Sequence, residues 1–274
     1  MRAILFLLAA SLSAFADPDY EAALKAMREE MGEGFRVEHV GLFVVATDAD
    51  ERTYERAKGS LTRCADALLS TYFDTRPDWV LACYLFDGGE SYGAFVQKRF
   101  GHEPSSPYGF YSRAGKCLVM DISTGTGTLV HEMVHAFAEA DFPSVPAWFN
   151  EGLGSLHEQC DMRDDGTLEG LTNWRLPILQ KGLTAGTVPT WEKLTNLSDD
   201  EFYGEDKGVN YASARYLCMW LQQEGLLARF YEQFRDHAAD DPHGWETLKS
   251  VLGRPADECE AEWRAWAAKL EWKR

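Results

Sequence analysis

The most informative stretch of the chain is residues 128–137, which read Thr128-Leu129-Val130-His131-Glu132-Met133-Val134-His135-Ala136-Phe137. Its apolar residues surround the polar ones at helical spacing, so it predicts a helix that faces a core. Residues four apart on a helix lie about 40° apart in projection, so His131 and His135 can reach one ion at roughly 2.0–2.1 Å. Glu132 is displaced by about 100°, outside that ligand pair but close enough to take a proton from an attacking water.

A third ligand is expected because catalytic zinc sites use three protein side chains. Glu151 offers one, sixteen positions after the second histidine, within residues 148–152, which read Trp-Phe-Asn-Glu-Gly. Pro143 and Pro146 interrupt the chain between the two segments, which lets the second helix turn back on the first. The sequence therefore predicts one zinc ion per chain, held by this glutamate and the two histidines.

The HExxH motif followed by a glutamate in an Asn-Glu-Gly context resembles the gluzincin peptidases, thermolysin-like and aminopeptidase-like enzymes included. An antiparallel strand before the motif helix and a later tyrosine-rich helix make residues 36–235 look like the compact bacterial proteins described as peptidase MA-like. This resemblance implies that His131, His135 and Glu151 bind zinc and that Glu132 is the catalytic base. It also implies a zincin-like fold.

Two further features bear on the reaction. Gluzincins often place a tyrosine or histidine of the helical lobe on the developing oxyanion, and the resemblance puts Tyr211 there. Tyr203 and Tyr216 compete for that role, and packing in an aromatic core is the ordinary role of a tyrosine. The GxMEN-like signature with which aminopeptidases of this clan bind a free amine is absent, which favours an endopeptidase.

One departure concerns how the zinc histidines are oriented. Thermolysin-like enzymes have an aspartate one turn after the third ligand, whereas this chain has Ser155. Zinc-binding imidazoles generally donate their second nitrogen to a fixed acceptor. Asn150, Asp121 or Glu158 are the available candidates, and the sequence does not choose among them.

Hydrophobic periodicity predicts an α+β fold with two lobes in one peptidase unit, residues 17–274. An N-terminal lobe, 17–128, alternates strands and helices, and the zinc-binding helices with a C-terminal helical lobe follow at 129–274. The motif helix lies at the junction, where a cleft forms most easily. Strand 116–122 is expected to offer an exposed edge to which an extended peptide can add. The predicted strands are 39–47, 79–86, 109–112 and 116–122, and the predicted helices are 20–31, 52–73, 91–100, 129–140, 147–158, 174–181, 211–223, 228–238 and 258–270.

The N-terminus has the pattern of a signal peptide. Met1 and Arg2 start it with a positive charge, residues 3–15 are largely apolar, and small residues precede Asp17. We expect residues 1–16 to be removed by cleavage after Ala16, which makes the mature protein secreted or periplasmic. The apolar run is shorter than the roughly 20 residues that span a bilayer, and no later stretch is apolar enough, so no membrane partner is expected.

Composition narrows the partners further. The formal net charge of −17 repels nucleic-acid phosphates, so we do not expect the protein to bind nucleic acid. Export to an oxidising compartment favours two or three disulfides among the six cysteines, with buried free thiols as the alternative.

These observations predict a secreted zinc metallopeptidase that hydrolyses peptide bonds of a peptide or protein substrate with a metal-activated water. The first alternative is a zinc-binding relative that has lost turnover and acts as an extracellular binding module. The second is an unrelated helical protein with a chance motif. The sequence leaves the oligomeric state open.

Overall fold

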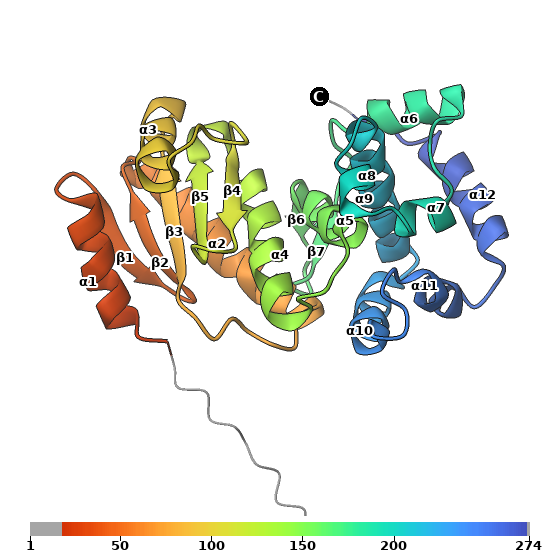
Figure 1. The fold of residues 1–274 in the computed structure, drawn as a ribbon, viewed down its shortest axis with the longest axis horizontal. Helices are drawn as coiled ribbons and strands as arrows, with labels where there is room; N and C mark the ends of the chain where they lie inside the picture. The colour runs from red at the N-terminus through yellow and green to blue at the C-terminus, as the bar shows by residue number, and fades with distance from the viewer. Residues whose placement is uncertain (1–17, 273–274) are drawn as a thin grey trace, which may run out of the picture.

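The computed structural model describes residues 18–272, so the predicted leader at 1–16 lies outside the described residues. A five-stranded mixed sheet with its helices forms the first half, and a helical half follows (Figure 1). This arrangement confirms the predicted α+β fold class. Between residues 18 and 272, no helix combines the length and the apolar composition that crossing a bilayer requires.

The sheet is mixed, with a parallel centre and antiparallel edges. Its strands are β1 (Arg36–Val40), β2 (Phe43–Thr47), β3 (Leu81–Phe86), β4 (Gly109–Ser112) and β5 (Cys117–Asp121). Their order is β1-β2-β3-β5-β4; β2, β3 and β5 run parallel, while β1 and β4 each pair antiparallel at an edge. Every residue of β2 and β5 is buried, which is typical of strands that helices cover on both faces.

Helices cover both faces of this sheet. They are α1 (Tyr20–Met31), α2 (Glu51–Thr71), α3 (Gly89–Phe100) and α4 (Gly127–Asp141), the last preceded by the 3₁₀ turn η1 (Ile122–Thr124). On one face, Leu24 of α1 and Phe95 of α3 pack in a core cluster with Val44 of β2. On the other, Leu61 of α2 and Met133 of α4 belong to a larger cluster that continues into the helical half. Helix α4 therefore lies at the junction of the two halves (Figure 1).

The predicted single strand at 39–47 is wrong, because that stretch contains the tight turn between β1 and β2. Val40 lies opposite Phe43, so Gly41 and Leu42 form a two-residue hairpin loop. Gly41 has a φ of 59°, a left-handed conformation that suits this kind of loop and that glycine adopts without strain. The apolar residues on both sides of the turn made the run look continuous.

The prediction that strand 116–122 has an exposed edge is also wrong. Strand β5 lies between β3 and β4, so both of its edges are already paired. The short strand β4 is the outer one: the chain enters the sheet at its edge through β4 and returns through β5, which pairs with β3. The exposed edge nearest the motif helix therefore belongs to β4.

The second half is built around one buried helix. Its elements are α5 (Ala147–His157), β6 (Cys160–Met162), β7 (Leu168–Gly170), α6 (Leu176–Ala185), α7 (Trp191–Thr195), α8 (Asp199–Phe202), α9 (Lys207–Gln223), α10 (Leu227–His237), α11 (Trp245–Leu252) and α12 (Ala256–Ala267). The hairpin β6–β7 and helices α7, α8 and α11 were not predicted. Helix α9 is central and packs closely on α5: a Cβ on Gly152 would lie 3.0 Å from the carbonyl oxygen of Ala214, so glycine permits this approach.

The prediction of two or three disulfides is wrong for the described residues, in which all six cysteines are free. Cys83 of β3 and Cys117 of β5 show why. They lie on adjacent parallel strands, but Cys83 is in register with Leu118, one position away from Cys117. Successive side chains on a strand point to opposite faces, so these two thiols lie in different core clusters.

Candidate metal centre

Helix α4 holds the motif side chains rigidly because it is packed on almost all sides. It contacts α2, β4, β5 and α5. Leu129, Val130, Met133 and Val134 are buried around the motif. Most of the helix surface is therefore used for packing, and the positions of His131, Glu132 and His135 follow from the fold.

The two motif histidines meet Glu151 of α5. One carboxylate oxygen of Glu151, Oε2, lies 3.2 Å from Nε2 of His131 and 3.6 Å from Nε2 of His135. The potential ligand atoms of all three residues lie within 4.8 Å of one another. Ligands about 2.0–2.1 Å from a tetrahedral ion lie roughly 3.3 Å apart, so this group can hold a metal ion.

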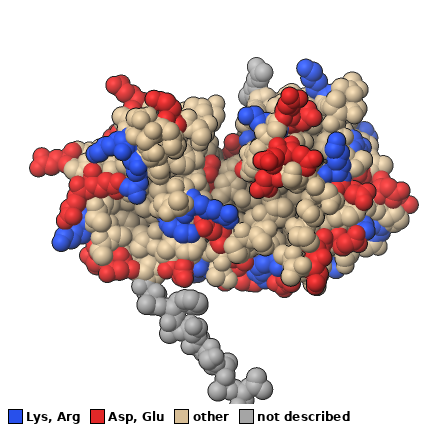
Figure 2. Space-filling model, in the orientation of Figure 1, with Lys and Arg blue, Asp and Glu red and all other residues tan. Residues whose placement is uncertain are grey.

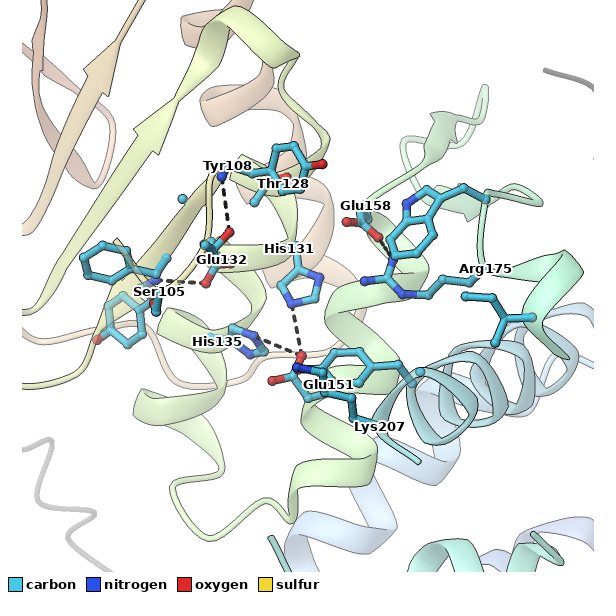
Figure 3. A pocket seen from close by; sticks show the side chains of 18 residues that line it. Ser105, Tyr108, Thr128, His131, Glu132, His135, Glu151, Glu158, Arg175 and Lys207 are labelled. Atoms are coloured by element: carbon cyan, nitrogen blue, oxygen red, sulfur yellow. Dashed lines mark hydrogen bonds and ion pairs between the residues drawn. The ribbon is translucent and has the colours of Figure 1, made fainter. Parts of the chain in front are cut away.

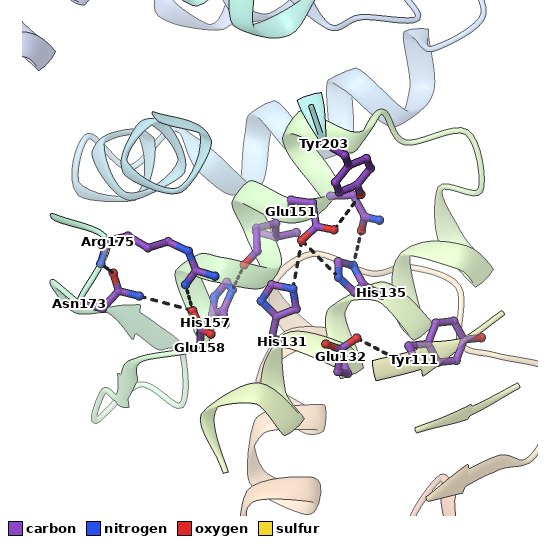
Figure 4. A network of polar contacts seen from close by, with 12 residues as sticks. Tyr111, His131, Glu132, His135, Glu151, His157, Glu158, Asn173, Arg175 and Tyr203 are labelled. Atoms are coloured by element: carbon purple, nitrogen blue, oxygen red, sulfur yellow. Dashed lines mark hydrogen bonds and ion pairs between the residues drawn. The ribbon is translucent and has the colours of Figure 1, made fainter. Parts of the chain in front are cut away.

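Two neighbours orient the ligands, as the polar contacts in Figure 4 show. Nδ1 of His135 lies 2.9 Å from Oδ1 of Asn150, and the Tyr203 hydroxyl donates to Oε1 of Glu151 at 2.8 Å. A hydrogen bond from Nδ1–H leaves the Nε2 lone pair of His135 directed at the metal position. The Tyr203 hydrogen bond leaves the other carboxylate oxygen, Oε2, facing both histidines.

The other two candidates for orienting a zinc histidine have different partners. The Asp121 carboxylate accepts from the N–H of Ser123 at 3.0 Å and caps η1. Glu158 forms an ion pair with Arg175. Of the three residues that the sequence left open, Asn150 is thus the one that contacts a motif histidine.

The remaining surroundings of His131 are apolar or small. Between residues 18 and 272, its buried Nδ1 has no hydrogen-bond partner, and neither does the buried hydroxyl of Ser155. Gly154 lies directly against the ring: a Cβ built there would be 3.2 Å from Nε2 of His131. The absence of a side chain at this position leaves room for the imidazole between α4 and α5.

Electrostatics separate the two glutamates of the site. Burial raises the pKa of Glu132 to about 7, although His135 and the Tyr111 N–H oppose this shift. Burial also acts to raise the pKa of Glu151, but its two histidine neighbours and the Tyr203 hydroxyl outweigh it and bring that pKa to about 2. Glu151 is therefore ionised at neutral pH, as a carboxylate that binds a metal must be. Glu132 has a pKa close to 7, so it can both accept and release a proton at neutral pH.

The edge strand holds the Glu132 carboxylate. The N–H of Tyr111 in β4 donates to Oε2 of Glu132 at 2.9 Å. The hydroxyl of the same tyrosine donates to Glu139, one helical turn beyond His135, at 2.6 Å. Strand β4 is thus attached to α4 at two points, which fixes the sheet edge beside the metal-binding group.

A cleft of about 550 Å³ opens over this group (Figure 3). One wall consists of β4 and the residues before it, and the other consists of Trp174, Arg175, Ile178 and the start of α9. The three metal-binding side chains and Glu132 line the cleft between these walls. The metal-binding group therefore lies in the cleft between the two halves of its lining.

The tyrosines that were candidates for the oxyanion role separate in the structure. Tyr211 lines the cleft, and its pKa is raised by burial and then by Glu151. The ring of Tyr203 lies 6.1 Å from that of Tyr211, but its hydroxyl is occupied by Glu151. Tyr216 is fully buried and accepts the N–H of Asn173, which is a structural role.

Trp174, Arg175 and Lys207 also line the cleft, and no motif of the sequence points to them. They come from a loop and from the first turn of α9, so no periodic spacing connects them to the motif.

No protein-family model matches this chain. No curated protein matches it significantly either.

Proposed function

We propose that this protein is a secreted zinc-dependent peptidase that hydrolyses peptide bonds. In this proposal His131, His135 and Glu151 hold zinc and Glu132 is the general base. The observation that carries it is the convergence of three potential ligand atoms from α4 and α5 to within 4.8 Å of one another, with Glu132 beside them in a cleft. Two imidazoles and one carboxylate form a donor set typical of catalytic zinc, which keeps a fourth position for water or substrate.

Bound zinc supplies a Lewis acid that polarises the substrate carbonyl and lowers the pKa of a water to about 7. The protein's part is to move the proton of that water. The Tyr111 N–H holds Oε2 of Glu132, and the carboxylate lines the cleft beside the metal-binding group, where in this proposal it accepts that proton. Glu132 then returns the proton to the leaving amine, which completes hydrolysis. In this proposal Tyr211, which lines the cleft, donates to the developing oxyanion.

The edge strand supports a polypeptide substrate. The carbonyl of Tyr108 accepts the N–H of Asp121 at 3.0 Å, which identifies Tyr108, Phe110 and Ser112 as the residues whose backbone groups face β5. The backbone groups of Gly109 and Tyr111 therefore point away from the sheet. The Tyr111 N–H already donates to Glu132, so an extended chain that adds along this edge would pair with the carbonyl of Tyr111 and the backbone of Gly109, whatever its own side chains are. Together with the missing signature for a free amine, the open cleft favours endopeptidase activity.

Export is part of the proposal because of the sequence alone. The positive start, the apolar stretch and the small residues before Asp17 form a signal-peptide pattern that predicts cleavage after Ala16. Mass spectrometry of the protein secreted by an expression host tests this, and we expect the mature chain to begin at Asp17.

The central test compares the wild type with Glu132→Gln and with a matched control, Glu232→Gln, which changes an exposed glutamate of α10. Zinc content and cleavage of a mixed peptide pool are measured for all three. We expect about one zinc per chain in each, and cleavage at least roughly 10²-fold slower for Glu132→Gln alone. The positions of the new termini in the digest distinguish internal cleavage from removal of terminal residues.

Each other outcome has a definite meaning. Equal cleavage by wild type and Glu132→Gln removes Glu132 as the base. Bound zinc without cleavage by any variant supports the extracellular binding module in place of the enzyme. A protein that binds no zinc eliminates both.

A further inference from the structure

One wall of the cleft carries positive charge that the proposed chemistry does not use. Apart from the metal-binding group and Glu132, the charged residues that line the cleft are Glu158, Arg175 and Lys207. Arg175 donates to Glu158, so their charges cancel. Within residues 18–272, Lys207 forms no ion pair, and its side chain is exposed. In the proposed zinc-bound state a divalent ion would balance Glu132 and Glu151, so that, among the described residues that line the cleft, Lys207 would have no charged partner.

The two cations lie at one end of the cleft. The Arg175 guanidinium lies over the Trp174 ring, 4.1 Å from its centroid, and 5.6 Å from the centroid of Tyr211. Lys207 precedes Tyr211 by one turn of α9, so the two share a helix face. In Figure 3, Arg175 and Lys207 lie on the far side of the histidines from Ser105. We call Arg175, Lys207 and the Tyr211 ring between them the cationic end of the cleft.

A lysine at this position is unfavourable for the helix itself. Lys207 is the first residue of α9, where the positive end of the helix dipole repels a cation, and the preceding Asp206 makes no capping hydrogen bond with its side chain. The protein as a whole is strongly acidic, with a net charge of −17, and acidic side chains are scattered over both halves in Figure 2. Helix stability therefore gives no reason for a cation at this position. Because Lys207 forms no ion pair with another described residue and lines the cleft that contains the metal centre, its charge is available to bind an anionic group.

We propose that the cationic end of the cleft binds a carboxylate of the substrate. The carboxylate is either the C-terminal group of a peptide or the side chain of an aspartate or glutamate. Arg175 provides a planar set of donors, of which only Nη1 is used by Glu158, and Lys207 provides a point charge. This inference rests on the proposed function in one respect, namely that the cleft takes a peptide.

The position of the carboxylate follows from the side chains that connect this end to the metal centre. Tyr211 connects this end to the metal centre. Its ring centroid lies 5.6 Å from the Arg175 guanidinium and 6.1 Å from the ring of Tyr203, whose hydroxyl donates to Glu151. Extended residues advance roughly 3.3 Å each, so about two residues span that side chain. The recognised carboxylate therefore lies within about two residues of the bond that is cleaved.

The experiment measures peptide binding to the zinc-loaded Glu132→Gln protein by calorimetry, because binding does not require turnover. The probes are N-acetylated penta-alanine with a free carboxyl terminus, its C-terminal amide, and amides with one glutamate or one glutamine at each position in turn. We expect at least one carboxylate form to bind about tenfold more tightly than its uncharged counterpart. The preference should weaken as salt is raised, because Lys207 is exposed.

Adding Lys207→Met to that protein should abolish the preference and leave binding of the uncharged peptides intact. Lys181→Met is the matched control, because Lys181 is an exposed residue of α6 that does not line the cleft, and it should retain the preference. The free-terminus pair and the glutamate–glutamine pairs separate the two sources of the carboxylate. A preference for the free terminus alone places cleavage near chain ends.

Equal binding of charged and uncharged peptides overturns the proposal, and so does a preference that survives Lys207→Met or a failure of all peptides to bind. The outcomes for the two proposals differ. Carboxylate-dependent binding without cleavage by the wild type contradicts the peptidase and keeps the carboxylate site. Cleavage of the peptide pool with no carboxylate preference does the opposite.

Discussion

Nδ1 of His135 lies 2.9 Å from Oδ1 of Asn150, the residue immediately before Glu151. One short segment of α5 therefore supplies both a carboxylate of the group that could hold a metal ion and the hydrogen-bond acceptor that orients a histidine of that group on α4. When Nδ1–H of His135 donates to this oxygen, Nε2 carries the lone pair that a metal needs.

Removal of that acceptor should weaken metal binding without removing a ligand. We expect Asn150→Ala to lower zinc affinity by roughly 10- to 100-fold, because the His135 ring loses its fixed orientation. Asn150→Asp keeps an acceptor at the same place and should retain affinity close to that of the wild type. Competition with a chromophoric chelator measures both constants. An Asn150→Ala protein with unchanged affinity would show that packing alone orients His135.

Gly154 gives a second test of the same geometry. A methyl group at this position would lie 3.2 Å from Nε2 of His131, the atom that faces Glu151, so the ring must move by a few tenths of an ångström. We expect Gly154→Ala to reduce zinc affinity by about tenfold while the protein stays folded. Gly93→Ala is the control, since a Cβ on Gly93 in α3 meets nothing within 4 Å. Zinc affinity should be the same for that variant and the wild type, and a similar loss in both would contradict the steric explanation.

The two tyrosines near Glu151 should differ in what their hydroxyls do. Tyr203→Phe removes the hydrogen bond to Oε1 of Glu151. We expect zinc affinity to fall by about tenfold, because loss of a hydrogen-bond partner of a metal ligand usually weakens metal binding by at least that factor. Tyr211→Phe should leave zinc affinity near the wild-type value and lower kcat by roughly 10²-fold, with little change in KM, if its hydroxyl stabilises the transition state. Zinc titration and steady-state kinetics on both variants separate the roles. If Tyr203→Phe carries the loss in kcat, the assignment must be exchanged.

The local parts of the site were predictable from the sequence. His131, Glu132 and His135 lie on one helix, so the period of 3.6 residues alone places them. Glu151 required one further step, since the prolines between the two helices indicated a reversal of the chain. The partner of His135 could not be chosen in the same way. It depends on how α5 crosses α4, which packing against α9 at Gly152 determines.

The parts of the fold that were predicted wrongly depend on how strands from different segments of the chain pair with one another. The apolar character of 39–47 indicated β-structure but not the turn at Gly41, because both strands of the hairpin are largely apolar. The order of β4 and β5 in the sheet depends on which of them pairs with β3, and the sequence of neither strand determines that by itself. The cleft-lining Arg175 and Lys207 come from segments about thirty residues apart in the sequence, and only the tertiary fold brings them together.

His157 predicts how stability depends on pH. It is fully buried on α5, its Nδ1 lies 2.9 Å from the Leu153 carbonyl oxygen, and burial lowers its pKa to about 4. In the unfolded chain a histidine has a pKa of about 6.5, so between these values the unfolded state takes up a proton that the folded state does not. This contribution to stability is complete above pH 6.5, falls as the pH decreases, and amounts to about 3 kcal/mol at most. Urea unfolding in the presence of a chelator, from pH 7.5 to 4, should therefore show a steeper loss of unfolding free energy for the wild type than for His157→Phe.

His237→Phe is the control, because His237 makes the same contact with a carbonyl four residues earlier but is exposed. Its plot of unfolding free energy against pH should run parallel to that of the wild type. Parallel curves for the wild type and His157→Phe would mean that this buried ring does not contribute to acid sensitivity.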